Sequence, residues 1–306
     1  MRKIILALAA SIGLTPATSF AWWDAGHMQI AAVAYTQLDA PVRDKIAALI
    51  RLHPDYAKWT QGLAPADQDK AAFVRSATWA DDIKAPAYGY TNDGNTPNGP
   101  QASQNIGYAD HLMHKYWHYL DIPFSPDGTP LHDPDPVNAL TQITTFTATL
   151  ASGASDDVKS YDLVWLVHLV GDAHQPLHAT SRFTHAVPGD AGGNSEGIKT
   201  TAGKEEALHA FWDGLLGDSS TPATAITAAA SLPAADPIRA VIYDPKVWFE
   251  ESFAAAQAFA YAPPIGADKG EFTLTPDYEQ RAHDVAQRQA AVAGARLAAL
   301  LNKALR

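Results

Sequence analysis

Two histidine–aspartate pairs in the sequence have the spacing that places both side chains on one face of a helix. His168 precedes Asp172 by four residues in LVHLVGDAH, and His209 precedes Asp213 by four residues in LHAFWD. Side chains four residues apart are neighbours on a helix surface. One such pair is more often an ion pair or hydrogen bond in a protein core. Two pairs favour a metal centre, because imidazole and carboxylate groups both bind divalent metals.

Asp172 gives the strongest argument for such a centre. It follows the apolar run 163–167 on a segment that is apolar on nearly all sides, so we expect a buried helix. A buried carboxylate is costly unless it is paired, hydrogen-bonded or bound to a metal. His168 could pair with it, and facing helices could supply further ligands. Other candidate residues lie in short motifs elsewhere: His27 on the first predicted helix, Asp81 in TWAD, His118 in HYLD and His178 in AHQPLH.

The composition limits the kind of metal site and the kind of partner. The sequence has no cysteine, so any ligands must be His, Asp, Glu, backbone or terminal groups, which indicates catalytic rather than structural ligation. The formal net charge is −11 and no run of Lys and Arg occurs, which argues against a protein that coats nucleic acid passively. A nucleic-acid substrate is still compatible with this charge if bound metal attracts it locally.

The first 21 residues have the pattern of a secretory signal peptide. Arg2 and Lys3 form a basic start, residues 4–10 are apolar, and Ser19-Phe20-Ala21 ends in the small residues typical of a cleavage site. The apolar stretch is too short to span a membrane. We therefore expect cleavage after Ala21, and a mature chain of residues 22–306 that is periplasmic or secreted and has no membrane span.

Periodicity predicts helices for most of the mature chain, and its length fits one large domain or two small ones. The predicted helices cover residues 27–39, 41–50, 66–84, 136–152, 161–174, 244–261 and 276–305. Segments 85–108, 123–136 and 182–204 are rich in Gly, Pro, Asn or Asp and are predicted as loops. Trp23 is expected to pack and Asp24 to cap the first helix. Strand patterns are scarce, so we expect a single, all-α, mainly helical domain.

Taken together, these motifs resemble the S1/P1 nuclease family of secreted, zinc-dependent enzymes that cut single-stranded nucleic acids. The matching elements run in family order over nearly the whole mature chain: Trp22 with His27, TWADDIK, WHYLD, LVHLVGDAHQPLH, the GGN loop, LHAFWD and AGARLAALLN. The resemblance implies three Zn²⁺ ions. The first would be bound by Asp81, His118, His168 and Asp172. The second would be bound by His178, His209 and Asp213. The third would be bound by the α-amino and carbonyl groups of Trp22, by His27 and by a bridging Asp172.

The resemblance also implies the chemistry. A hydroxide shared by two zinc ions beside Asp172 would attack phosphorus in line, because zinc lowers the pKa of bound water. The products would be 5′-nucleotides from single-stranded DNA and RNA, and 3′-phosphates would also be removed from nucleotides. Lys84 stands where fungal members carry an arginine. It could neutralise charge on the reacting phosphate as a point donor, or it could be a solvated surface residue.

For the base, the resemblance implies Tyr119, Asp121 and Asn194 as binding residues. An aromatic face accepts any unpaired base, which accounts for a single-strand preference. Tyr119 could instead be a core aromatic residue, and Asp121 could orient a ligand histidine. Two features differ from the fungal members: the stretch between Asp81 and His118 is longer, and cysteine is absent.

Two other functions are compatible with the motifs. A zinc phospholipase C resembles this chain in fold, in a cluster of three zinc ions and in an N-terminal tryptophan ligand. It carries a glutamate where this chain has Asp213, and it lacks a GGN loop, so the nuclease is favoured. A non-catalytic exported zinc-binding protein is the alternative from another class, although storage proteins use flexible His- or Asp-rich tracts rather than ligands on helices. No obligate protein partner is evident, so we expect a monomer.

Overall fold

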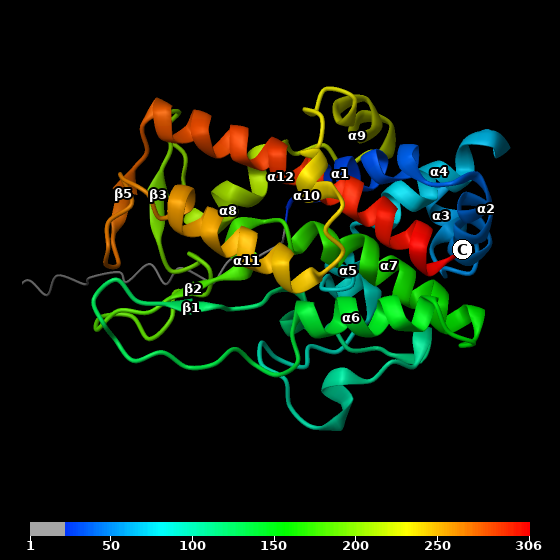
Figure 1. Ribbon diagram of the computed structural model, residues 1–306, viewed down its shortest axis with the longest axis horizontal. Coiled ribbons are helices and arrows are strands. Elements are labelled where there is room, and N and C mark those ends of the chain that lie inside the picture. The colour runs from blue at the N-terminus through cyan, green and yellow to red at the C-terminus, as the bar shows by residue number, and fades with distance from the viewer. Residues whose placement is uncertain (1–21) are drawn as a thin grey trace, which may run out of the picture.

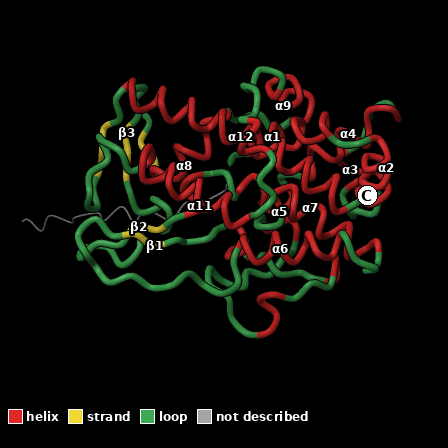
Figure 2. The backbone as a smooth tube through the Cα atoms, viewed as in Figure 1, coloured by secondary structure: helices red, strands yellow, loops and turns green. Residues whose placement is uncertain are grey.

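The computed structural model describes residues 22–306, so the expected leader and its cleavage after Ala21 lie outside the described residues. The described chain is mainly helical, as expected, with a few short strands gathered away from the end where the C-terminus lies (Figures 1 and 2). None of the helices in this part of the chain combines the length and apolarity that a membrane span needs.

The α-helices, in chain order, are α1 (Asp24–Gln37), α2 (Ala40–Ile50), α3 (Tyr56–Trp59), α4 (Pro65–Ser76), α5 (Trp79–Asp82), α6 (Ala139–Leu150), α7 (Asp156–Asp172), α8 (Leu208–Asp213), α9 (Pro222–Ala229), α10 (Pro237–Ala240), α11 (Pro245–Ala255) and α12 (Pro276–Ala304). Short 3₁₀ turns are η1 (Pro86–Tyr88), η2 (Pro100–Ser103), η3 (Gly107–Ala109), η4 (Lys115–His118), η5 (Pro176–Ala179) and η6 (Gly214–Leu216). A π-helical turn, η7 (Ala256–Ala260), continues α11.

The strands form two small sheets. β1 (Pro123–Phe124) pairs in parallel with β2 (Ser181–Arg182). β3 (Gly197–Lys199) lies between β4 (Glu205–Ala207), to which it is antiparallel, and β5 (Glu271–Thr273), to which it is parallel. Both sheets involve the glycine-rich segment 182–204 and the residues that border it, so they fix the loop that precedes α8.

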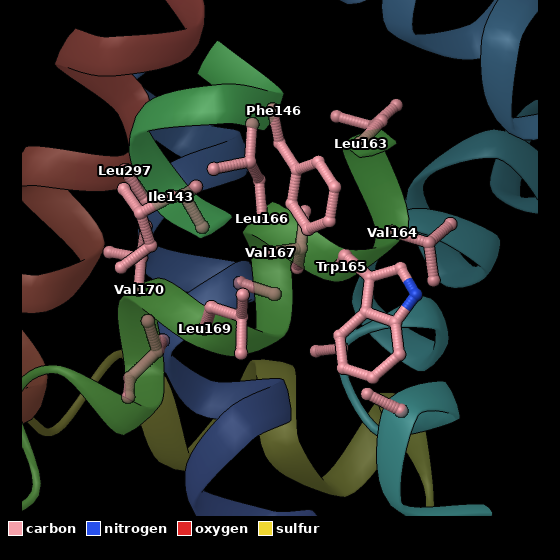
Figure 3. Packing of buried hydrophobic residues seen from close by; sticks show 14 of the residues in the cluster. Ile143, Phe146, Leu163, Val164, Trp165, Leu166, Val167, Leu169, Val170 and Leu297 are labelled. Carbon is pink, nitrogen blue, oxygen red and sulfur yellow. The ribbon is translucent and has the colours of Figure 1, made fainter. Parts of the chain in front are cut away.

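Helix α7 is the centre of the core. Its side chains from Ser160 to Asp172 are all buried, which agrees with the expectation of an apolar central helix. Close by, α7 meets Ile143 and Phe146 of α6 and Leu297 of α12 (Figure 3). Burial of these side chains on several faces fixes the rotation of α7 about its own axis, and this rotation decides where His168 and Asp172 point.

Helices α1 and α12 cross closely because a glycine lies at the crossing. A Cβ added at Gly294 would stand 2.5 Å from Cγ1 of Val33 and 3.0 Å from the carbonyl oxygen of Ile30. Helix α12 begins after Thr275, whose hydroxyl accepts the N–H of Tyr278, with Pro276 at its first position. This long helix thereby holds α1, and with it His27, against the core.

Two details differ from the sequence-based expectations. The predicted helix 66–84 is broken into α4 and α5, because the hydroxyl of Thr78 bonds the carbonyl of Arg75 and the carbonyl of Ala77 is taken by His168. Asp24 does not cap α1: it is the first helical residue, and the capping position belongs to Trp23, without a side-chain bond to the helix.

Candidate metal centre

Buried His and Asp side chains converge in three groups in the described chain, two of which share His168. In each group, the possible ligand atoms lie within 4.8 Å of one another. The groups are His27, Asp81 and His168; His118, His168 and Asp172; and His178, His209 and Asp213. These residues come from α1, α5, η4, α7, η5 and α8, so segments that are far apart in the sequence bring together every His and Asp named as a candidate ligand.

The carboxylate of Asp172 faces two of these groups at once. Its Oδ2 lies 3.1 Å from Nδ1 of His118 and 3.2 Å from Nε2 of His168. Its Oδ1 lies 3.4 Å from Nε2 of His27. The side chain has no exposed surface. A carboxylate placed in this way has the geometry to bridge two metal ions.

Three of the histidines are oriented by backbone carbonyl groups. In each, Nδ1 donates to a carbonyl oxygen, which leaves Nε2 as an acceptor directed at the centre. The three bonds run from His168 to Ala77 at 2.7 Å, from His178 to His118 at 2.8 Å and from His209 to Gly192 at 2.7 Å. This arrangement is typical of histidines that bind a metal through Nε2.

Facing nitrogen atoms provide a test of whether a metal fits. Nε2 of His178 lies 3.0 Å from Nε2 of His209, although both Nδ1 atoms already carry the donated proton. Two acceptor lone pairs at this distance repel each other unless a cation or an added proton compensates them. Burial lowers the pKa of His209 to about 4. Burial and the nearby His209 lower the pKa of His178 well below its usual value. An added proton on either ring is therefore disfavoured.

Buried polar atoms without a hydrogen-bond partner gather at the same place. They include both ring nitrogens of His27, Nε2 of His118, Oδ1 of Asp172 and Oδ2 of Asp213. Each unsatisfied buried polar atom destabilises a fold by about 1–3 kcal/mol, so such a concentration requires compensation. A bound cation would supply it, and the nitrogen and oxygen donor set suits zinc.

Burial raises the pKa values of two acids of the centre. Burial raises the pKa of Asp172 to about 6 against the opposing effect of His168, and it raises that of Asp213 well above its usual value. Without a bound cation, ionisation of these two carboxyl groups therefore costs free energy. A bound cation would favour the ionised forms, because opposite charge lowers a carboxyl pKa.

Two glycines make room for the histidines. A Cβ at Gly171 would lie 2.7 Å from Nδ1 of His27, so only glycine allows α1 to bring this ring against α7. The ring of His27 then stacks on that of His168 at 3.9 Å. Gly192 has φ +62°, and a Cβ there would collide with the carbonyl oxygen of Leu177. Gly171 directly precedes the predicted ligand Asp172, which is a sequence signal for close approach, whereas Gly192 meets His209 only through the fold.

The beginning of the described chain lies against the same helices. Trp22 is fully buried and its indole N–H donates to the carbonyl of Gly171 at 3.1 Å. The backbone N–H of Trp23 donates to the carbonyl of Asp213 at 3.0 Å. The ring of Trp23 packs against Gly214, in agreement with the packing role expected for it. Trp22 is therefore held between the end of α7 and the end of α8.

Lys84 is not a solvated surface residue. Its side chain is 6% exposed, and its Nζ lies 2.6 Å from Oδ1 of Asp81. Asp81 is itself one of the grouped acids. The charge of Lys84 is thus fixed at the edge of the metal-binding groups.

Two of the three residues expected to bind a base share a segment with His118, and the third, Asn194, lies in the turn whose backbone holds His209. Tyr119 directly follows His118 and Asp121 is three residues after it. Burial raises the pKa of Asp121 to about 7, with a contribution from nearby acids. Both are only partly buried, as is Asn194. Asn194 donates to the carbonyl of Ala191 at 2.7 Å in the turn that also holds His209.

Sequence reasoning missed Gln175 as a residue of the centre. Its Nε2 donates to Oδ1 of Asp213 at 2.6 Å, and its Oε1 accepts the N–H of Leu177. It therefore connects η5, which carries His178, to α8. Its place between two histidines in HQPLH is the only sequence signal for this role.

The comparison with known families agrees with the geometry. No curated protein matches the chain. The family model described as S1/P1 Nuclease matches residues 22–306, which is the whole of the described chain. A nuclease of this family hydrolyses phosphodiester bonds, and its dependence on zinc fits the buried His and Asp groups. With its mainly helical fold and its convergent ligand groups, the chain belongs to the S1/P1 nuclease family.

Proposed function

We propose that the protein is an exported zinc-dependent phosphodiesterase. It would hydrolyse single-stranded DNA and RNA to 5′-nucleotides and remove 3′-phosphates from nucleotides. The observation that carries the proposal is the position of Asp172, whose two carboxylate oxygens face different histidines. Family membership supports the reaction class.

Three Zn²⁺ ions would be held by three sets of ligands drawn from the convergent residues. One set would be the group of His118, His168 and Asp172 together with Asp81, whose Oδ1 lies 3.9 Å from Nε2 of His168. A second set would be His178, His209 and Asp213. The third would be His27, Asp172 and the terminal amino and carbonyl groups of Trp22, which the proposed cleavage after Ala21 makes available. The unpartnered atoms of His27, Asp172 and Asp213 support this assignment.

Zinc supplies Lewis acidity toward the phosphate and makes water a stronger nucleophile near neutral pH. The residues of the chain position these groups and exclude bulk water. Asp172 is fully buried and fixes the spacing between two ligand sets. Lys84, held beside Asp81, would offset negative charge on the phosphate as a point donor.

Base recognition would fall to the segments next to the ligands. The ring of Tyr119 would stack on the base, and Asp121 and Asn194 would hydrogen-bond its edge. Stacking on an aromatic face requires an unpaired base, which favours single strands. The partial exposure of all three side chains is compatible with this role.

The test uses the naturally processed protein, which we expect to be a periplasmic or secreted monomer without an obligate partner. Zinc per chain is measured first. Three assays then measure nucleotides released from single-stranded DNA, RNA and duplex DNA, phosphate released from 3′-nucleotides, and phosphocholine released from lipid. The proposal expects nucleotide release that is lost on chelation and restored by zinc. Release of phosphocholine alone would establish a phospholipase C, and a zinc-loaded protein that hydrolyses none of these substrates would be a zinc-binding protein only.

A further inference from the structure

The segment between α5 and α6 contains a loop that is closed at its base. The N–H of Thr91 donates to the carbonyl of His111 at 2.7 Å, and the N–H of Met113 donates to the carbonyl of Thr91 at 2.9 Å. We call residues 91–114 the 91–114 loop. It lies in the teal part of the chain that runs beneath α6 in Figure 1. Residues 91–101 are largely exposed, whereas the second half of the loop is held on α7, where Asn105 bonds Asp162 and Tyr108 bonds Ser160.

His114 anchors the exposed arm of this loop, which carries Asp93. Its side chain is fully buried between two acids: Nε2 lies 2.9 Å from Oδ2 of Asp110, and Nδ1 lies 3.2 Å from Oδ2 of Asp93. The backbone N–H of His114 donates to Oδ1 of Asp93 at 2.9 Å. The hydroxyl of Tyr116 donates to the same acid at 2.7 Å. One histidine thus ties together both arms of the loop.

The backbone conformation of His114 is unfavourable, so its side-chain contacts must stabilise it. Its φ of 45° is in the left-handed region, which is uncommon for a residue other than glycine and costs free energy. Its ring stacks on Trp117 at 3.6 Å, almost parallel. Burial alone would lower the pKa of His114, but its hydrogen bonds to Asp110 and Asp93 raise it. The contacts of its ring with two acids explain why this conformation is kept.

The loop reaches the residue that is expected to stack on the base. The hydroxyl of Tyr119 donates to the backbone carbonyl of Asn95 at 2.5 Å. Asn95 lies two residues after Asp93, so the anchored acid and the carbonyl belong to one short stretch of backbone. The ring of Tyr119 is consequently fixed from the side of the 91–114 loop as well as from its own segment.

We propose that the 91–114 loop is a specificity element of the substrate cleft, in which His114, through Asp93 and Asn95, positions the ring of Tyr119 for the base of a single-stranded substrate. The proposal rests on the proposed nuclease function. It assigns His114 no contact with substrate or metal. Replacing His114 should therefore weaken binding of the nucleotide base and leave the metal centre unchanged.

The test is a double-mutant cycle on KM and kcat with a single-stranded oligonucleotide. His114→Ala removes the anchor, and Tyr119→Phe removes only the hydroxyl that reaches Asn95. We expect each to raise KM about tenfold, because a misplaced ring loses most of its stacking on the base. The double variant should raise KM no further, since both changes break the same connection. For His114→Ala, kcat should stay within about twofold of the wild type, zinc per chain should be unchanged and amide protection of residues 91–113 should fall.

The matched control is His185→Ala, which removes another histidine bonded to an acid, Asp127, outside the loop. It should leave KM unchanged. A folded His114→Ala enzyme with the KM of the wild type would overturn the proposal. A double variant whose increase in KM is the product of the two single increases would overturn it as well. If His114→Ala does not fold, Asp110→Asn provides the same test by removing one of the two charges.

A wild-type enzyme that cleaves no single-stranded oligonucleotide would refute the proposed function instead. The amide protection of residues 91–113 would still show whether His114 anchors the loop.

Discussion

At the scale of single residues, the centre depends on atoms whose partners come from other segments. The spacing of His168 and Asp172 predicted that both would lie on one helix face, and the structure has them 3.2 Å apart. The sequence could not show that His168 bonds the carbonyl of Ala77, because this requires the break between α4 and α5. One signal for close approach, Gly171 next to Asp172, was present in the sequence but has meaning only once α1 is placed against α7.

Replacing Asp172 by alanine should remove zinc and nearly all hydrolysis. One carboxylate serves two ligand sets, so we expect fewer zinc ions per chain and a loss of activity of about a thousandfold or more. Metal analysis and initial rates on single-stranded DNA measure both. Asp156→Ala, at the exposed start of the same helix, is the control and should retain both. Full zinc content in Asp172→Ala would rule out its bridging role.

Gly171→Ala should displace His27. The added methyl group would lie 2.7 Å from Nδ1 of this ring, so the ring must move and one zinc should bind more weakly, by about 10- to 100-fold, as for other residues that orient ligands. Zinc titration with a competing chelator gives the affinity. Gly153→Ala is the matched control, because a Cβ there meets no other atom within 4 Å. Equal affinities in the two variants would show that the close approach is unimportant.

At the scale of elements, the helices were more predictable than their connections. The apolar pattern of α7 and the long α12 follow from periodicity, although α7 begins at Asp156, five residues before the predicted helix 161–174, and ends at Asp172, two residues before its predicted end. The strands were not predicted, because each has two or three residues, too few for an alternating pattern. The loop segment 85–108 gave no indication of its anchor, since Asp93 and His114 are 21 residues apart and meet only when the loop closes.

The anchor of the 91–114 loop should make its stability depend on pH. The folded-state pKa of His114 is raised above its usual 6.5, so its contribution is complete below pH 6.5 and is lost as pH rises through the raised value. Burial raises the pKa of Asp93, but its bonds to His114 and Tyr116 lower it overall below 3.8. The contribution of Asp93 is therefore present above pH 3.8 and is lost on further acidification.

Amide protection of residues 91–113, corrected for intrinsic exchange, should accordingly be greatest between about pH 4 and 6.5 and should decline at alkaline pH. Apart from Asp93 and Asp110, the hydroxyl of Tyr116 is the remaining titratable group in contact with the His114 ring. The His114→Ala variant is the control and should lack the alkaline decline. Protection that rises steadily from pH 6 to 9 in the wild type would contradict this account.

At the scale of the whole molecule, the metal centre and the core are one structure. The ligands lie on elements that also form the core around α7, and they bring many unpartnered polar atoms into it. The resemblance stated from the motifs predicted the family and the ligand types. The sequence alone could not give the arrangement of the ligands, because it depends on how α1, α5 and α8 pack around α7.

Removal of metal should therefore lower the stability of the whole domain. A ligand that binds the folded state stabilises it by about 2.7 kcal/mol per site at a hundredfold excess over Kd, so chelation should lower Tm by several degrees. Differential scanning calorimetry before and after chelation, with zinc re-addition as the control, measures this shift. A Tm that does not change on chelation would mean that the centre is stable without a cation.

The most direct test of the central claim is crystallography of the processed protein with diffraction data on both sides of the zinc absorption edge. We predict anomalous peaks at the three ligand sets named under Proposed function, with two of the peaks beside the carboxylate of Asp172, which faces His118 and His168 on one side and His27 on the other. A zinc-active enzyme that shows no anomalous peak beside Asp172 would contradict this prediction.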